Sequence, residues 1–277
     1  MKKASFRLFF KVLFGSVIFI SCTKEESDLT SAHNNNIADA AFNHINSVID
    51  AELAFFENQF DINKINSFIS KEHDSCSDIT LSLSSDSSYI DSLLIDYGEK
   101  GCKWKERTKT GKILITQNGK RNHVGTQTKI ELINFTIDNY SIKATQTIER
   151  TELEINSGKW ICTDHVEVID AIINNINQTN EFRWNSDRIR QGSIINDELV
   201  FCVEGNMNGI NSKGKKYTTT TKTPLKFKLN CPRIISGKLN LYEESGINPK
   251  TIDYGDGTCD SKATISTEYN EHKVSLW

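Results

Sequence analysis

An internal repeat that carries cysteines constrains the fold of this 277-residue chain more than any other feature. The string Ile95-Asp-Tyr-Gly-x3-Cys102 returns as Ile252-Asp-Tyr-Gly-x3-Cys259, and each copy has a second cysteine upstream, Cys76 or Cys231. A recurrence at several matched positions indicates two related units, which we place at about residues 76–160 and 200–277. We expect each unit to be closed by its own disulfide, Cys76–Cys102 and Cys231–Cys259, worth about 3 kcal/mol in the chain-entropy model.

Two further cysteines, Cys162 and Cys202, belong to neither copy and lie in apolar runs. The sequence is compatible with a cross-strand disulfide between them and with two buried thiols. Six cysteines after Cys22 form an even number, which favours disulfides in an exported protein. No pair has CxxC spacing, so we expect no zinc and no other cofactor.

From Cys76 onward, alternating runs rich in Ile, Val, Thr, Tyr and Phe predict β-strands. Asp-Gly, Asn-Gly and Ser-Gly pairs between the runs are typical of hairpin turns. The clearest runs are Ile79–Leu83, Lys112–Thr116, Thr128–Ile137, Ser141–Ile148, Trp160–Ile169, Leu199–Val203, Tyr217–Thr223, Leu225–Leu229, Ile234–Leu241 and Ala263–Glu268. We therefore predict a mainly all-β domain over residues 73–277, an antiparallel meander or sandwich of two disulfide-stapled units. One sheet or two lobes, and strand or helical turn at Ala171–Ile176, stay open.

Residues 37–72 predict a helical segment in front of this β domain. Apolar positions from Ala41 to Phe60 recur at intervals of three and four residues, the spacing of one face of an amphipathic helix. Asp61 and Asn63 are expected to break the helix, and Ile65–Ile69 to add a short turn. We expect the helix to pack on the sheet rather than to act as an independent interaction element.

The first 21 residues have the layout of a secretory signal peptide, with four basic residues, Lys2, Lys3, Arg7 and Lys11, before an apolar stretch at Val12–Ile20. This stretch is too short for a membrane-spanning helix, which needs about 20 apolar residues. It ends in Phe19-Ile-Ser-Cys22, which resembles the lipobox of bacterial lipoproteins, although Phe19 stands where Leu is usual. We expect cleavage before Cys22 and lipid attachment to it; the alternative is an ordinary signal with a chance cysteine.

The segment after Cys22 bears on the cellular location of the protein. Lys24, Glu25 and Glu26 resemble the signal that sends Bacteroidota lipoproteins to the outer face of the outer membrane. Residues 22–36 contain few groups that could be buried, and we predict a lipidated cysteine followed by a flexible tether. A multiply acylated cysteine is a stable anchor, since each buried methylene adds about 0.8 kcal/mol. The alternative location faces the periplasm.

Composition and charge exclude one class of partner. Hydrophobic residues make up 37% and charged residues 25% of the chain, within the range of globular proteins. The formal charge of −3 becomes −7 once the four basic residues of the signal are removed. An acidic chain argues against nucleic acid, for which a basic footprint is expected.

Taken together, several of these elements resemble a family of uncharacterised lipoproteins of Bacteroidota. They are the lipoprotein cysteine, the short helix, the two Ile-Asp-Tyr-Gly-x3-Cys strings, Gly111–Thr116, and the glycine pattern Gly205-x3-Gly209-x4-Gly214. The resemblance covers residues 76–277 and implies no activity or catalytic residue. The chain departs from the family in its extra pair Cys162 and Cys202 and in an asparagine-rich segment around Asn174.

Three carboxylates in the second copy, those of Asp253, Asp256 and Asp260, raise the question of a calcium site. The spacing is not that of an EF-hand, because Gly255 and Gly257 stand at alternate positions. In the first copy Lys103 replaces Asp260. Asp256-Gly257 also suits a type I′ hairpin turn, and we favour the turn over a metal.

No catalytic motif is present: the chain lacks a nucleophile elbow, HExxH, P-loop and GxGxxG. Cys162 and His165 would form a dyad only if they shared a strand face, and three residues of separation place them on opposite faces. We therefore expect a non-enzymatic role. A hydrolase acting on extracellular polymer is the alternative, resting on location and abundant carboxylates.

Trp104, Trp184 and Trp277 stand among polar neighbours and are the candidate binding residues. Exposed aromatic rings stack on sugars or anchor protein interfaces, but strand residues that cover a sheet explain them as well, and we favour that explanation. The sequence thus predicts a surface lipoprotein held to the outer membrane through Cys22. Its expected role is structural, adhesive or ligand-binding, with a glycan or a protein as ligand; a periplasm-facing envelope component is a further alternative.

Overall fold

The computed structural model describes residues 28–59, 76–104, 106–156, 159–178, 180–195, 198–244, 246 and 248–277. One helix, α1 (Thr30–Gln59), precedes fourteen strands. The strands are β1 (Asp78–Leu83), β2 (Ile90–Asp96), β3 (Cys102–Trp104), β4 (Arg107–Gln117), β5 (Gln127–Ile137), β6 (Tyr140–Asn156), β7 (Lys159–Asn175), β8 (Asn180–Ile195), β9 (Glu198–Ile210), β10 (Lys216–Lys228), β11 (Cys231–Glu243), β12 (Lys250–Asp256), β13 (Lys262–Ser266) and β14 (Glu271–Ser275).

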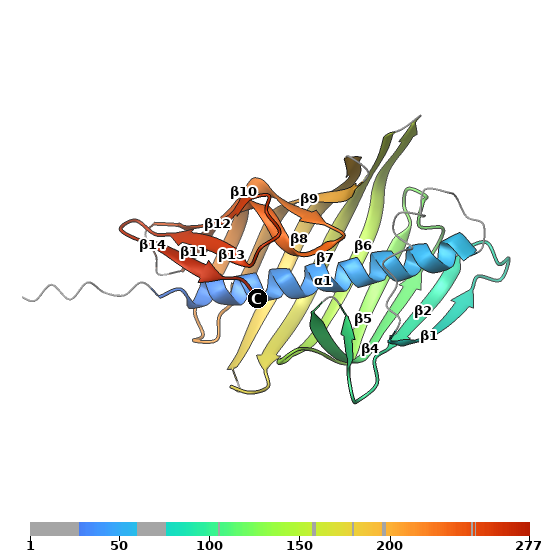
Figure 1. Ribbon diagram of the computed structural model, residues 1–277, viewed down its shortest axis with the longest axis horizontal. Helices are drawn as coiled ribbons and strands as arrows, with labels where there is room; N and C mark the ends of the chain where they lie inside the picture. The colour runs from blue at the N-terminus through green and yellow to red at the C-terminus, as the bar shows by residue number, and fades with distance from the viewer. Residues whose placement is uncertain are drawn as a thin grey trace, which may run out of the picture.

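All strands belong to one antiparallel sheet in which chain neighbours are sheet neighbours, apart from short β3, which pairs only with β4 (Figure 1). The prediction of a mainly antiparallel β domain preceded by a helix is confirmed. The two repeats form one continuous meander, with the first copy near one end of the sheet and the second near the other. Consecutive pairing follows from the short hairpin connections, which only antiparallel neighbours can use.

The strands in the middle of the sheet are longer than the runs seen in the sequence. β6 and β7 have 17 residues each, and β10 joins Tyr217–Thr223 and Leu225–Leu229 into one strand across Pro224. Ala171–Asn175, left open as a helical turn, continues β7. Inward residues are buried and outward ones exposed along these strands, as in β8 where Phe182 and Trp184 are buried and Arg183 is exposed.

Bulges at glycines bend the sheet. Gly111 in β4 has a φ of +78°, and a Cβ there would lie 2.2 Å from the carbonyl oxygen of Asn134 on β5. Gly237 in β11 has a φ of +115° and approaches the backbone of β10 in the same way. Only glycine tolerates both the dihedral angle and the close approach. Because a bulge bends its strand and increases the local twist, the sheet curls around α1.

Helix α1 begins earlier than the sequence suggested. It starts at Thr30, after Asp28 accepts a hydrogen bond from the Thr30 backbone N–H at 3.1 Å, a capping interaction. The prediction of a flexible tether over residues 22–36 is therefore wrong for residues 30–36. The helix extends to Gln59, and the predicted break and short turn at 61–69 lie outside the described residues. The signal peptide, Cys22 and the export signal Lys24–Glu26 lie outside them as well.

The helix is buried on nearly all sides and contacts β2, β8 and β11. Apolar residues such as Ile37, Ile45 and Leu53 are at most 1% exposed, but so are the polar Asp39 and Glu52. The helix packs on the sheet as expected, and its polar face is enclosed as well. In Figure 1 the long middle strands cross behind α1, and the C-terminal strands β11–β14 curl over its N-terminal half.

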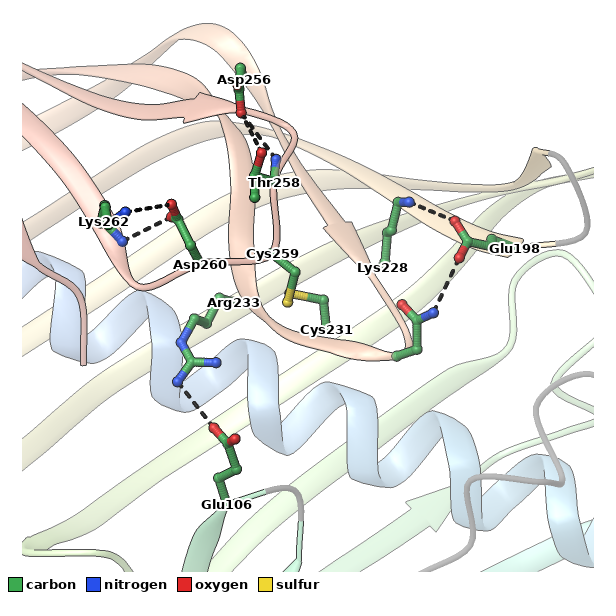
Figure 2. Close-up of a disulfide and its surroundings, with 11 residues drawn as sticks. Glu106, Glu198, Lys228, Cys231, Arg233, Asp256, Thr258, Cys259, Asp260 and Lys262 are labelled. Atoms are coloured by element: carbon green, nitrogen blue, oxygen red, sulfur yellow. Dashed lines mark hydrogen bonds and ion pairs between the residues drawn. A yellow bond between two sulfur atoms is a disulfide. The ribbon is translucent and has the colours of Figure 1, made fainter.

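Two contacts between distant parts of the chain complete this enclosure. Arg233 on β11 donates to the Glu106 carboxylate at 3.1 Å and so connects the second copy to the turn after β3; Figure 2 draws this pair with α1 behind it. At the C-terminus the Trp277 ring packs edge-on against Tyr140, with 5.0 Å between centroids, and under the Arg107 guanidinium at 4.0 Å.

Both predicted disulfides are confirmed, Cys76–Cys102 and Cys231–Cys259 (Figure 2). The two copies also share their turn. The motif aspartates, Asp96 and Asp253, each accept a hydrogen bond from the N–H of the glycine two residues on. Each also forms an ion pair of 2.7 Å with a lysine of the neighbouring strand, Lys112 or Lys238.

Candidate functional site

Buried ion pairs fix α1 on the inner face of the sheet. At its N-terminal half, Asp39 accepts a hydrogen bond from Arg188 of β8, and both side chains are at most 6% exposed. Asn35 donates to the same carboxylate at 2.9 Å and accepts from the Trp184 indole at 3.2 Å. Burial raises the pKa of Asp39, while the Arg188 guanidinium works against that rise.

A second cluster holds the C-terminal half of α1. Asp50 accepts hydrogen bonds from Arg121 and from Arg190, the latter at 2.9 Å. Arg190 also donates to Asp164 at 2.8 Å, and Asp164 accepts from Arg150 at 2.5 Å. The two arginines lower the pKa of Asp164, although its burial acts in the opposite direction. The cluster alternates charges and pairs each carboxylate with two guanidinium groups, as burial of charge requires.

The charge of the helix complements that of the sheet. Residues 30–59 contain four acidic residues and no lysine or arginine. The inner face of the sheet carries five buried or half-buried cations, namely Lys109, Arg121, Arg150, Arg188 and Arg190. This complementarity explains how a polar helix can occupy the interior, and we assign these charges to architecture rather than to chemistry on a ligand.

The candidate site is a cleft of about 620 Å³ where α1 begins, which we call the N-terminal cleft. Its walls come from the start of α1, the β7–β8 and β9–β10 turns, β12, β13 and the C-terminal segment. An apolar floor is formed by Ile37, Phe182, Ile252, Ile265, Val274 and Leu276. Polar side chains of the lining are Asn34, Asn36, Asn175, Gln178, Asn180 and Ser212.

Asn36 distinguishes this cleft from a simple gap between elements. Its side chain is 6% exposed, lines the cleft and has no hydrogen-bond partner among the residues that the structure describes. The unpaired amide atoms of Asn36 are not fully buried, so they are open to the cleft and available to a bound molecule. Asn34 beside it accepts a hydrogen bond from the Ser212 N–H at 2.8 Å, which leaves its NH₂ group as a donor.

At the mouth of the cleft one carboxylate pairs with two lysines, which leaves one positive charge in excess. Asp28 pairs with Lys213 and Lys215, each at 3.1 Å, and its main-chain carbonyl accepts from Lys250 at 2.6 Å. The Thr30 hydroxyl, which donates to Asp28, holds the pKa of that carboxyl well below its usual range, and the lysines act in the same direction. Asp28 is the one carboxylate among the described lining residues. The cleft therefore lacks, within that lining, the pair of carboxyl groups that a glycosidase uses.

The structure places the three candidate tryptophans elsewhere. Trp184 is 1% exposed and stacks on Phe42 of α1, so its interpretation as an exposed binding residue is wrong. Trp104 is half-buried and contacts His44 and the Lys109 ammonium. Trp277 is half-buried in the closing contact described above. All three pack within the fold, the alternative that the sequence analysis favoured.

The structure also locates Cys162, Cys202 and His165. Cys162 and Cys202 are free thiols, and the cross-strand disulfide considered for them is not formed. They pair with adjacent residues of β8, Gly192 and Gln191, and so lie on opposite faces of the sheet. His165 faces outward to Asp187 at 2.7 Å, away from buried Cys162, as its spacing predicted.

The three aspartates of the second copy stabilise their own turns. Asp253 bonds Gly255 and Lys238, Asp256 accepts from the Thr258 N–H and hydroxyl, and Asp260 accepts from the Lys262 N–H. No cluster of metal-ligating side chains occurs within the described part of the chain. Asp256 has no positive φ, so Asp256-Gly257 does not form the expected type I′ turn, which needs one at both residues.

The asparagines of the cleft were missed because Asn34, Asn35 and Asn36 were assigned to a tether on composition alone. Two signals were present: Asp28 can cap a helix, and Ala32 lies at helical spacing before Asn36 and Ile37. The chain matches no known family model, no curated protein and no solved structure. Among the described residues no helix is long and apolar enough to cross a membrane.

Proposed function

We propose that the protein is a surface lipoprotein that binds an uncharged polar molecule in the N-terminal cleft, without acting on it as an enzyme. The observation that carries this proposal is Asn36, whose amide is open to the cleft and has no hydrogen-bond partner among the described residues. A ligand that donates and accepts hydrogen bonds would satisfy this amide and the free NH₂ group of Asn34. Pockets that combine an apolar lining with a few placed polar groups are typical ligand sites.

The chemistry of the lining defines the class of ligand. Amide groups come from the start of α1 and from the β7–β8 turn, the floor is apolar, and the carboxylate at the mouth is paired. A molecule with hydroxyl groups on one side and a less polar face on the other fits both walls. A neutral monosaccharide has these properties, whereas a cationic ligand would find no free counter-charge, because Asp28, the one carboxylate of the described lining, is already paired with lysines.

The expected anchor places this cleft near the membrane. Asp28, at the mouth, follows Cys22 by six residues, and an extended chain spans at most about 3.6 Å per residue. The cleft would lie within roughly 22 Å of a lipidated cysteine along the chain. This distance favours a ligand held in the cell envelope or captured at its surface.

The binding proposal is tested by removing the Asn36 amide. Asn36→Ala keeps a good helix former at a helical position, so we expect the variant to fold. Isothermal titration of the detergent-solubilised full chain against glucose, galactose, mannose and N-acetylglucosamine should show binding of at least one sugar, weakened about 3- to 10-fold in the variant. Asn43→Ala, two turns further along α1 and outside the cleft, is the matched control and should bind like the native protein.

If the native protein binds none of these sugars, or if both variants lose affinity equally, the proposed ligand class is rejected. Exposure of the protein on the cell surface is tested separately. Protease added to intact cells should cut the native protein but not a Lys24→Ala, Glu25→Ala, Glu26→Ala variant. Protection of both would instead favour the periplasm-facing envelope component.

A further inference from the structure

A second cleft, of about 860 Å³, lies on the outer face of the sheet, across β7 to β11. We call it the outer cleft. It is independent of the N-terminal cleft, because its residues alternate with inward ones: Arg183 lines the outer cleft, and Phe182 lines the N-terminal cleft. Its floor is a row of side chains at matched register on adjacent strands, formed by Asn185, Asn208, Thr218 and Tyr242.

The amides in this row are oriented by hydrogen bonds. The Asn185 carbonyl accepts the Asp170 backbone N–H at 2.6 Å, and its NH₂ group donates to the Asn208 carbonyl at 3.2 Å. Asp170 holds a φ of +52°, uncommon for a residue with a side chain, and this turn brings its N–H to Asn185. The Asn208 NH₂ group is thereby fixed as a donor toward the cleft, and the Thr218 hydroxyl beside it can donate or accept.

An aromatic ring and aliphatic side chains complete the cleft. Tyr242 at the β11 end of the row is 43% exposed, and Ile210, 38% exposed, lies beside the row with Ile172. A flat exposed ring next to fixed polar groups suits stacking against the apolar face of a sugar.

Charges in the outer cleft come in opposite pairs. Lys216 lies 3.7 Å from Glu244, and Glu243 forms an ion pair with Lys250 at 2.9 Å. Arg183 and Asp170 add one charge of each sign to the lining. The lining itself holds three carboxylates and two cations, and Lys250, the partner of Glu243, balances the charges, so no strong excess of either sign attracts a polyanion or a polycation.

We propose that the outer cleft binds a neutral polysaccharide chain that lies across the strands. Adjacent strands are about 4.8 Å apart, so the row from β8 to β11 extends over about 14 Å. One step of the row is close to the length of a pyranose ring, and successive sugars would meet the amides, the hydroxyl and the ring of Tyr242 in turn. This site does not depend on the ligand of the N-terminal cleft.

Affinity electrophoresis of the detergent-solubilised full chain tests the proposal. The probes are soluble neutral polymers (amylose, laminarin, xylan and mannan), with polygalacturonate as the anionic comparison. We expect retardation by at least one neutral polymer and none by polygalacturonate. Tyr242→Ala should weaken that retardation about 10-fold, since it removes the stacking ring, and Asn208→Ala about 3- to 10-fold.

Tyr269→Ala is the matched control, because Tyr269 is 78% exposed on the β13–β14 turn, outside the outer cleft. It should bind like the native protein, and so should Asn36→Ala, which separates this site from the N-terminal cleft. The proposal is overturned if no neutral polymer retards the native protein, if only polygalacturonate does, or if Tyr269→Ala and Tyr242→Ala lose affinity equally.

Discussion

The two copies of the Ile-Asp-Tyr-Gly-x3-Cys motif are alike in their turns and different in what surrounds them. Tyr97 and Tyr254 are both buried, at 4% and 1% exposure. In the first copy the Lys109 ammonium lies 4.5 Å from the centroid of the Tyr97 ring, a cation–π contact. In the second copy the charge of Asp39, together with burial, raises the pKa of Tyr254 well above its usual value.

The partner of the motif aspartate also comes from a different place in the chain. Lys112 lies on β4, the strand after the first motif, whereas Lys238 lies on β11, the strand before the second motif. In both cases the lysine follows a bulge glycine, Gly111 or Gly237. The same local geometry is thus assembled with opposite chain order, which teaches that the motif specifies a turn and a buried ring but not its neighbours.

The two copies should differ most in how much stability is lost when a buried charge beside each motif tyrosine is removed. Asp39→Asn should destabilise the protein by about 3–5 kcal/mol, because it leaves the Arg188 guanidinium buried without its carboxylate. Lys109→Met should cost less than Asp39→Asn, since the apolar stem still covers the Tyr97 and Trp104 rings while the cation–π attraction is lost. Urea unfolding of the full chain in detergent measures both.

A double variant checks this explanation. Asp39→Leu with Arg188→Met removes both charges together and should destabilise less than Asp39→Asn alone. A larger loss in the double variant would show that the pair contributes net stability rather than compensating its own burial.

The next effect concerns the disulfides, in which the copies should behave alike. Their cysteines are 26 and 28 residues apart, and each bridge joins one buried and one exposed cysteine. Loop closure then predicts that replacing either pair with alanine costs about 3 kcal/mol, with little difference between pairs. Chemical denaturation of the two double variants measures both losses. If the losses of unfolding free energy differ by more than about 1 kcal/mol, the surroundings of each bridge, and not the loop length, set its contribution.

The smallest effect is the pH dependence of the motif aspartates. The hydrogen bond from Lys112 lowers the pKa of Asp96; burial raises that of Asp253, but bonds from Lys238 and Gly255 outweigh it and leave the pKa lowered. A lowered folded-state pKa contributes stability above the ordinary value of 3.8, and this is lost as the pH falls through the folded value. Asp96→Asn and Asp253→Asn should each lower the melting temperature slightly at pH 6, and the difference from the native protein should shrink toward pH 2.

This shrinkage should be similar in both copies, since both aspartates form surface ion pairs with a lysine. A variant whose melting temperature differs from that of the native protein by the same amount at pH 6 and at pH 2 would show that the Asp–Lys pair contributes nothing through its charge. Thermal melts monitored by circular dichroism are sufficient.

Much of the architecture could be predicted because it depends on local patterns. Alternation along the strands, the recurrence of the motif and the even number of cysteines predicted the antiparallel domain and both disulfides. The start of α1 was missed because its buried residues, Asn34–Asn36 among them, have the composition of a solvated tether. The burial of Trp184 was not settled either, since polar neighbours in a strand point to the opposite face.

Strand alternation and the cysteine pairs followed from the sequence alone, because each depends on residues close in the chain or on a repeated spacing. Only the tertiary structure decided that acidic α1 lies among arginines of β6 to β8, that Trp277 meets Tyr140, and that Asn36 is left without a partner. Those outcomes depend on how far the sheet curls around the helix. That curvature is the sum of twist and bulges over fourteen strands, and no single stretch of sequence encodes it.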